Sequence, residues 1–243
     1  MTDRHNSELY KIFNNAINMI VARTPEEIRE DMRNLIGSIY NSKDGNKSIA
    51  NLDNFIKNYE NKPCIIAAGE WIVFIDRDAS GKAGILSTVY SQIYSPRKKI
   101  DKKYRVIYVV SSVGTEYEKK KESKQFSPKI TKYRSIAKDI TEKYIDKFIS
   151  FEILFYNELL YDQAQFILSV KDVKIFSEEE DVKKLINENL FTETQIHRLI
   201  VDDPFSRYYG LKIGDIVRCK RKNQSNAGGL DIISFIRVID DIE

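Results

Sequence analysis

The segment 203–215 constrains the local fold more than any other part of the chain, because residues that start, stop and turn a helix follow one another in order. Asp203 is a typical helix cap, and Pro204 fits the first helical position because no backbone N–H is needed there. Gly210 can end the helix in a left-handed conformation, and Gly214 can take the positive φ of a turn. The pattern predicts one or two helical turns followed by a sharp change of direction.

The residues that follow this turn have the spacing of strands. Residues 215–221 alternate in polarity, residues 230–239 form an apolar strand-like run, and the polar segment 223–229 separates them. Two such runs joined by a short loop predict an antiparallel hairpin. We therefore expect a short helix that leads into a β-hairpin at the carboxyl end.

Upstream, helical and strand-like spacing alternate. Residues 24–27 (Thr-Pro-Glu-Glu) resemble a capping box, Ser177 is a candidate cap for a later helix, and Thr192 is a similar cap ahead of Ile196. Segment 151–166 fits a helix and a strand equally. Helices are predicted over 9–20, 28–39, 52–59, 85–94, 130–149 and 178–187, and strands over 64–68, 71–75, 105–111 and 166–176.

The order of these elements predicts two domains. Residues 1–150 are expected to form an α/β domain of helices and a mixed sheet, and residues 151–243 a smaller α+β domain.

Charge is distributed unevenly along the chain. The whole chain carries 39 Lys and Arg against 36 Asp and Glu, which excludes a polycation that binds nucleic acid by bulk charge. Residues 95–150, however, have a net charge of +9, whereas residues 1–94 sum to −1 and residues 151–243 to −5. The middle of the chain is therefore either a solvated basic surface or a contact for phosphate groups.

Motifs of catalysis and cofactor binding are missing from the sequence. His5 and His197 have no nucleophile or metal ligand at catalytic spacing, and there is no Gly-rich phosphate loop. Cys64 and Cys219 stand in apolar, strand-like contexts, as does Trp71, so all three are expected in the core. We expect no catalytic residue, no metal and no cofactor.

One group of carboxylates leaves an enzymatic alternative open. Glu70, Asp76 and Asp78 flank a strand near Lys82, and paired carboxylates can hold Mg²⁺ for phosphodiester cleavage. The Asp/Glu-x-Lys element of nucleases is not evident, so turn chemistry accounts for these residues better. A Mg-dependent, nuclease-like enzyme is the alternative function.

Three stretches of the carboxyl third resemble one family. Residues 203–217 follow the pattern Asp-Pro-x-x-Arg-Tyr-Tyr/Phe-Gly and then a Gly-x-Val/Ile turn into a basic strand. Residues 192–199 resemble the approach to that motif, with His197 where Pro is usual, and residues 177–180 resemble its Ser/Thr-x-Glu-Glu helix start. The family is the fifth subunit shared by the eukaryotic nuclear RNA polymerases, together with its archaeal counterpart.

The sequence also departs from this family. The hairpin loop 221–228 lacks the usual Pro and Glu, and a Pro-x-His that maps to Lys171–Val173 is lost. Residues 106–115 resemble the apolar strand and Gly-x-Thr-Pro loop of the eukaryotic-type jaw domain, with Glu116 in place of Pro. This divergence fits a protist, or a large DNA virus that encodes its own polymerase.

The resemblance implies a non-catalytic subunit of a multisubunit DNA-directed RNA polymerase. The amino-terminal domain would be part of a jaw around downstream double-stranded DNA, and the carboxy-terminal assembly domain would bind the largest subunit and other core subunits. The expected interface residues are Asp203, Pro204, Arg207, Tyr208, Tyr209, Gly210 and Gly214. Residues expected near the DNA, independent of its sequence, are Arg97, Lys98, Lys99, Lys102, Lys103, Thr115, Lys119, Lys120 and Lys121.

The remaining expectations concern partners and location. A further interpretation of the same residues is a transcription-factor-like adaptor protein that contains this carboxy-terminal domain. No apolar run approaches the ~20 residues of a membrane span, so no membrane partner is expected. The expected location is the nucleus for a cellular protein, and the cytoplasm or the virion for one that a virus encodes.

Overall fold

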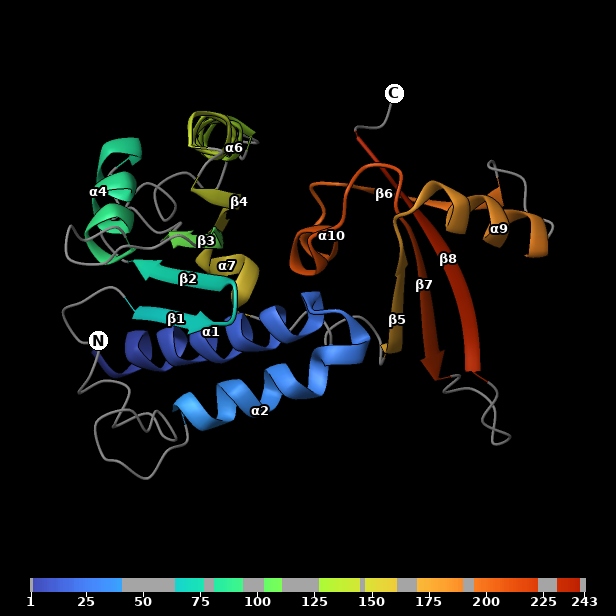
Figure 1. The fold of residues 1–243 in the computed structure, drawn as a ribbon, viewed down its shortest axis with the longest axis horizontal. Helices are drawn as coiled ribbons and strands as arrows, with labels where there is room; N and C mark the ends of the chain where they lie inside the picture. The colour runs from blue at the N-terminus through green and yellow to red at the C-terminus, as the bar shows by residue number, and fades with distance from the viewer. Residues whose placement is uncertain are drawn as a thin grey trace. The chain divides into compact units, whose positions relative to one another are not determined.

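The computed structural model describes residues 2–40, 64–76, 81–93, 103–110, 127–144, 147–160, 170–189, 195–222 and 231–240 (Figure 1). The chain divides into two units, residues 1–160 and residues 161–243. A division at residue 150 would cut through strand β4 (Phe148–Phe155), which pairs with the first sheet. The Asn15 side chain also donates a hydrogen bond to the Leu159 carbonyl at 2.8 Å. Residues 151–160 therefore belong with the first unit.

The first unit is built on a four-stranded sheet in the order β1-β2-β3-β4. Strands β1 and β2 are antiparallel, whereas β2, β3 and β4 run parallel, so the predicted mixed sheet is present. The elements are α1 (Thr2–Arg23), η1 (Glu26–Ile28), α2 (Arg29–Tyr40), β1 (Cys64–Ala68), β2 (Trp71–Asp76), α4 (Gly81–Ile93), β3 (Tyr104–Val110), α6 (Ser127–Lys143), β4 and α7 (Tyr156–Leu159).

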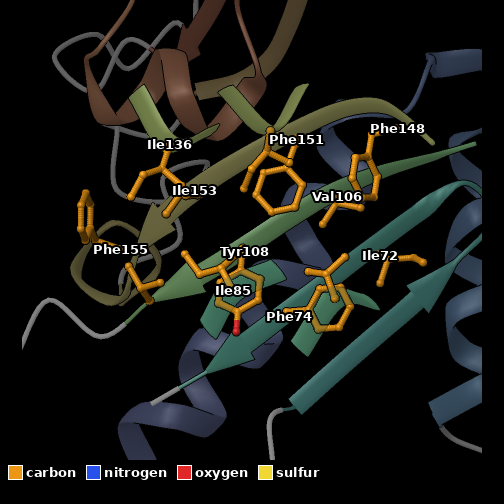
Figure 2. Packing of buried hydrophobic residues seen from close by; sticks show 13 residues of the cluster. Ile72, Phe74, Ile85, Val106, Tyr108, Ile136, Phe148, Phe151, Ile153 and Phe155 are labelled. Atoms are coloured by element: carbon orange, nitrogen blue, oxygen red, sulfur yellow. The ribbon is translucent and has the colours of Figure 1, made fainter. Parts of the chain in front are cut away.

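Helices cover both faces of this sheet. Helices α1 and α2 lie on one face, and α4 and α6 lie on the other (Figure 1). Because alternate residues of a strand point to opposite faces, a strand that is buried on both sides is apolar in successive positions, as β3 is from Val106 to Val110. The core on the α4 and α6 side is shown in Figure 2 and consists of Ile72, Phe74, Ile85, Val89, Val106, Tyr108, Val110, Ile136, Ile140, Phe148, Phe151, Ile153 and Phe155.

Buried ionic contacts join α1 to the sheet on its other face. The Arg23 guanidinium donates hydrogen bonds of 2.9 and 3.0 Å to the Glu152 carboxylate, and the Arg23 side chain is almost fully buried. The guanidiniums of Arg23 and Arg105 lie 5.7 and 5.6 Å from the ring centroid of Trp71. Trp71 and Cys64 are both buried, as predicted.

Two predictions for the first unit are wrong at element boundaries. The helix predicted over 130–149 ends at Lys143, and residues Phe148 and Ile149 belong to β4. The chain turns between them, with the backbone N–H groups of Lys147 and Phe148 donating to the Tyr144 carbonyl. Phe148 continues the helical spacing only by coincidence, because its burial comes from the sheet core.

The predicted capping box at 24–27 is also wrong. The Thr24 hydroxyl donates to the Ile20 carbonyl at 2.8 Å and so closes the end of α1. Pro25 precedes η1 and makes no side-chain cap. Within the helix predicted over 28–39, Ile28 and Leu35 are exposed, whereas Ile36 is buried. The helix predicted over 52–59 lies outside the described residues.

The second unit has its own four-stranded sheet, in the order β5-β7-β8-β6. Strand β7 pairs antiparallel with β5 and β8, which confirms the predicted hairpin, and β6 pairs parallel with β8. Leu185, Ile196 and Ile216 form its buried cluster beneath α9. The elements are β5 (Val170–Phe176), α9 (Glu179–Asn189), β6 (His197–Ile200), α10 (Pro204–Tyr209), β7 (Ile216–Lys222) and β8 (Asp231–Ile239).

One local prediction in the second unit needs correction. With Ser177 as its cap, the helix is predicted to begin at residue 178. In the structure, α9 begins at Glu179, and the Val182 N–H donates a hydrogen bond to the Glu178 carbonyl. The cap predicted at Thr192 lies outside the described residues, and the residues after Ile196 form strand β6. None of the described helices has the length and apolar character needed to cross a membrane.

Candidate functional site

Helix α10 and its flanking turns form the candidate site in the second unit. The Asp203 carboxylate accepts a hydrogen bond from the Phe205 N–H at 2.8 Å, and the Asp203 carbonyl accepts one from the Arg207 N–H at 2.9 Å. Pro204 occupies the first turn, where its missing N–H costs no helical bond. The cap predicted from the sequence is confirmed atom by atom.

Gly210 ends the helix as predicted. Its φ of 66° and ψ of 35° are left-handed, a conformation that a residue with a Cβ adopts at a cost. The Gly210 N–H donates to the Arg207 carbonyl at 3.3 Å, and the Leu211 N–H donates to the Ser206 carbonyl at 2.9 Å. These are the two bonds of a Schellman motif, which satisfies carbonyls that a helix end would otherwise leave exposed.

The turn after the helix is tied to the hairpin. Gly214 has a φ of 95°, and its N–H donates to the Val238 carbonyl of β8 at 2.9 Å. The buried Asp215 carboxylate accepts from the Lys212 N–H at 2.7 Å. The Ser206 hydroxyl, also buried, donates to the Ile200 carbonyl at the end of β6. The segment 203–215 is therefore fixed at several points to β6 and β8.

The aromatic residues of α10 face inward. Tyr208 is 2% exposed and Tyr209 is 9% exposed. The Phe205 and Tyr209 ring centroids are 4.7 Å apart, and those of Tyr208 and Tyr209 are 5.2 Å apart. Their apolar surface is thus used within the chain, so these rings contribute to the order of the motif. Their predicted contact with a partner stays a prediction.

The exposed surface of the motif is formed by residues other than Tyr208 and Tyr209. Pro204, Gly210 and Lys212 are exposed, and Ile213 is 59% exposed. Asp203, Arg207 and Gly214 are partly buried. Ile213 is not among the interface residues expected from the sequence, although an apolar residue between Lys212 and a turn glycine is a recognisable signal of an exposed contact. Ile213 is the most exposed large apolar residue among the described side chains.

Most of the residues predicted to lie near DNA cannot be placed. Lys103 is exposed and directly precedes β3, where the Tyr104 N–H donates to the Lys147 carbonyl. The Lys147 ammonium lies 4.7 Å from the Tyr90 ring centroid, so a second cation stands at the amino ends of β3 and β4. The other candidates, Arg97, Lys98, Lys99, Lys102, Thr115, Lys119, Lys120 and Lys121, lie outside the described residues.

The carboxylates of the nuclease alternative do not converge. Glu70 precedes β2 and Asp76 ends it, so a six-residue strand, roughly 20 Å long, separates them. Glu70 pairs with Arg105 at 2.6 Å, and Lys82 pairs with Asp139 at 2.8 Å. In the described part of the chain, no group of three or more His, Cys, Asp or Glu is placed to hold a metal. Asp78 lies outside that part.

Asp76 has a structural partner instead. It accepts a hydrogen bond from the Tyr108 hydroxyl, which comes from the centre of the first core. Burial, together with this bond, raises the pKa of Tyr108. The phenol therefore stays protonated and remains a donor, and the carboxylate serves to satisfy a buried hydroxyl.

The site lies inside a region that is similar to a known protein family. Residues 168–230 match the sequence model described as RNA polymerase Rpb5, C-terminal domain. The chain is also 31% identical over 81 residues to the "DNA-directed RNA polymerase subunit 5-like protein 1" of Arabidopsis thaliana. That match covers 31% of this chain and 37% of the relative, so it spans little more than a third of the relative's length. Segment 203–215, with its cap and Schellman motif, lies inside the residues that match the family.

Proposed function

We propose that this chain is a non-catalytic subunit of a multisubunit DNA-directed RNA polymerase, because residues 168–230 match the sequence model of the Rpb5 C-terminal domain. The observation that carries the proposal is the rigid motif 203–215 inside the matched region, with its cap, its left-handed stop and its ties to β6 and β8. A motif held in one conformation loses little entropy on binding, which suits a permanent subunit contact.

In this proposal the second unit docks on the largest subunit of the polymerase. Ile213 and Lys212 offer an exposed apolar and a cationic side chain next to each other, and Pro204 lies exposed on the same motif. An apolar residue surrounded by polar ones is typical of the centre of a protein interface. The partly buried Arg207 is of a residue type common among energetically important contacts.

The amino-terminal unit has a separate part in the proposal, as part of a jaw around downstream DNA. Residues 95–150 carry a net charge of +9, and the described cations Lys103 and Lys147 stand at the amino ends of β3 and β4. Lysine contacts to phosphate give binding that is independent of sequence and sensitive to salt. This is the kind of contact that suits a polymerase, which moves over every sequence.

The docking proposal is tested with the tagged full chain, expressed together with the two large polymerase subunits of its source. We expect one copy per polymerase that persists through a high-salt wash. Ile213→Glu puts a charge on the exposed side chain and should reduce recovery about tenfold. Leu35→Glu, at an exposed apolar position of α2, is the matched control and should not change recovery. Failure of the unmodified chain to recover the large subunits would refute the docking.

The DNA proposal is tested on the assembled polymerase. Replacing Lys98, Lys99, Lys102 and Lys103 with alanine should lower the affinity for downstream duplex DNA and flatten its dependence on salt by about one unit of log–log slope per lost contact. Replacing Lys183 and Lys184 of α9, which are exposed cations of the second unit, is the control. An unchanged salt slope in the first variant would place the DNA elsewhere.

The compartment follows from the proposed assembly. A polymerase subunit is found where the enzyme meets its template, which is the nucleus for a cellular protein and the cytoplasm or virion for one that a virus encodes. Imaging of a fluorescent fusion beside a marker of the large subunit tests this, because the two signals should coincide.

A further inference from the structure

The outer edge of β8 is covered along only part of its length. Strand β6 pairs with β8 from Ile236 to Ile239, and β7 pairs along β8 from Asp231 to Arg237 on the other side. Among the described residues, no strand lies beside 231–234 on the side away from β7. Figure 1 shows β6 beside the end of β8 nearest α10, whereas the opposite end of β8 forms the margin of the sheet.

The course of the chain explains why β6 begins so late. Ile196, which directly precedes β6, is buried with Leu185 and Ile216 beneath α9. The chain therefore approaches β6 from one face of the sheet and does not run in line with it. The position in the sheet next to 231–234 is left vacant by the described segment that leads into β6.

This vacant position has two exposed apolar side chains. Ile232 is 50% exposed and Ile233 is 53% exposed. Consecutive strand residues point to opposite faces, so each face of the edge presents one isoleucine. An exposed, apolar strand edge readily pairs with another strand, and proteins normally cover or charge such edges. The residues 232–234 carry no charge of their own.

The surroundings of the edge are cationic on one face. Lys220 is the direct cross-strand neighbour of Ile233, and the next pairs on that face contain Lys174 and Arg218. The carboxylate of this group is Asp172, which is bound to the Arg218 guanidinium at 2.9 Å. The register pair of Asp231 and Lys222 continues the same face and adds one charge of each sign, so cations stay in excess of carboxylates, which favours an acidic partner.

We propose that residues 231–234 of β8 receive a β-strand from the polymerase's largest subunit, apolar opposite Ile232 and Ile233 and acidic on the face of Lys220. The inference rests on the proposed function, and it assigns a second contact, distinct from the motif 203–215. Strand addition would give about four backbone hydrogen bonds, because alternate residues of an antiparallel strand direct both N–H and C=O outward. The affinity comes from the backbone, and the isoleucines and Lys220 select the partner.

Hydrogen exchange on the full chain, free and in complex with the largest subunit, tests the backbone contact. The amides of 232–234 that point away from β7 should exchange at least tenfold more slowly in the complex. Unchanged exchange at these amides in a complex that still forms would overturn the inference and leave the proposed subunit function intact. Failure of the complex to form would refute both.

Substitutions separate the apolar and the charge contributions. Ile233→Glu and Ile233→Lys both remove the apolar contact, so both should weaken binding about tenfold or more, and the glutamate variant should weaken it further because its carboxylate repels an acidic partner strand and neutralises Lys220. Tighter binding of Ile233→Glu than of Ile233→Lys would show that the partner is not acidic on this face and would overturn the inference. Equal binding of both variants and the unmodified chain would overturn the inference.

Two controls complete the experiment. Ile28→Glu changes a side chain that is 50% exposed in the first unit and should leave binding and exchange at 232–234 unchanged. Sedimentation of the free chain distinguishes a second copy as the occupant. A concentration-dependent dimer that protects the same amides, and that Ile233→Glu abolishes, would overturn the assignment to the largest subunit.

Discussion

The two units of this chain hold a four-stranded sheet in order by different means. In the first unit, helices cover both faces, and one continuous core joins β2, β3 and β4 to α4 and α6. In the second unit, the buried cluster beneath α9 is small, the rings of Phe205, Tyr208 and Tyr209 are buried separately, and caps and turns add local hydrogen bonds. The first unit thus depends on one large packed core, whereas the second combines smaller packing contacts with local backbone bonds, so the same kind of substitution should affect them differently.

The largest expected effect comes from opening a cavity in the first core. Phe74 is fully buried and stacks on Tyr108, with ring centroids 5.6 Å apart. Phe74→Ala should lower the free energy of unfolding of the first unit by about 3–5 kcal/mol. Leu185→Ala, in the smaller cluster, should cost the second unit about 2–3 kcal/mol. Urea unfolding, monitored by hydrogen exchange in each unit, measures both values. Equal losses of unfolding free energy in the two units would remove the distinction between the cores.

An intermediate effect is expected from the backbone of the second unit. Gly210→Ala places a Cβ at a φ of 66° and should cost about 1–2 kcal/mol without any loss of packing. Asp203→Ala removes the cap on Phe205 and should cost about 1 kcal/mol, whereas Asp203→Asn keeps an acceptor and serves as the control. Thermal unfolding of the full chain, followed in the second unit, gives these values. If Asp203→Asn is as destabilising as Asp203→Ala, the cap bond is not the cause.

The same contrast explains which parts of the fold could be predicted from sequence. The motif 203–215 was predictable because its bonds join residues within a few positions of one another, as the contact of Asp203 with Phe205 does. Strand β6 was not predictable, because its pairing with β8 joins residues far apart in sequence. Helical periodicity also failed at Phe148, because a helix and a strand would both bury this residue. The capping box failed at Thr24, because its hydroxyl donates a hydrogen bond to the end of the preceding helix.

The backbone conformation of the site could be predicted from the sequence, but the exposure of its side chains could be predicted only in part. The sequence indicated the cap, the left-handed glycine and the hairpin, because each depends on residue type at a fixed offset. It did not indicate that Tyr208 and Tyr209 would be buried, because burial depends on what packs around α10. For the same reason the exposure of Ile213 and of the β8 edge became evident only from the tertiary arrangement.

The smallest expected effect is on the pKa of a carboxyl group in one ion pair from each unit. Lys82 of α4 pairs with Asp139 of α6, and its hydrogen bond and charge lower the pKa of Asp139. Lys183 pairs with Glu179 within the first turns of α9 and lowers the pKa of Glu179 in the same way. A carboxyl group with a lowered folded-state pKa stabilises the fold above its unfolded-state value, and this contribution is lost as the pH falls through the folded-state value. Both contributions should therefore disappear on acidification below about pH 4.

The two pairs differ in what they require. The pair of Lys82 and Asp139 joins two helices and needs the packed first unit, whereas the pair in α9 needs only one helix. NMR titration should show the pKa of Asp139 returning toward its ordinary value in Lys82→Met. The same return is expected in Phe74→Ala under conditions that unfold its first unit. The pKa of Glu179 should change in Lys183→Met alone. If Phe74→Ala raised the pKa of Glu179 as well, the second unit would depend on the first, and the contrast between packing and local geometry would not hold.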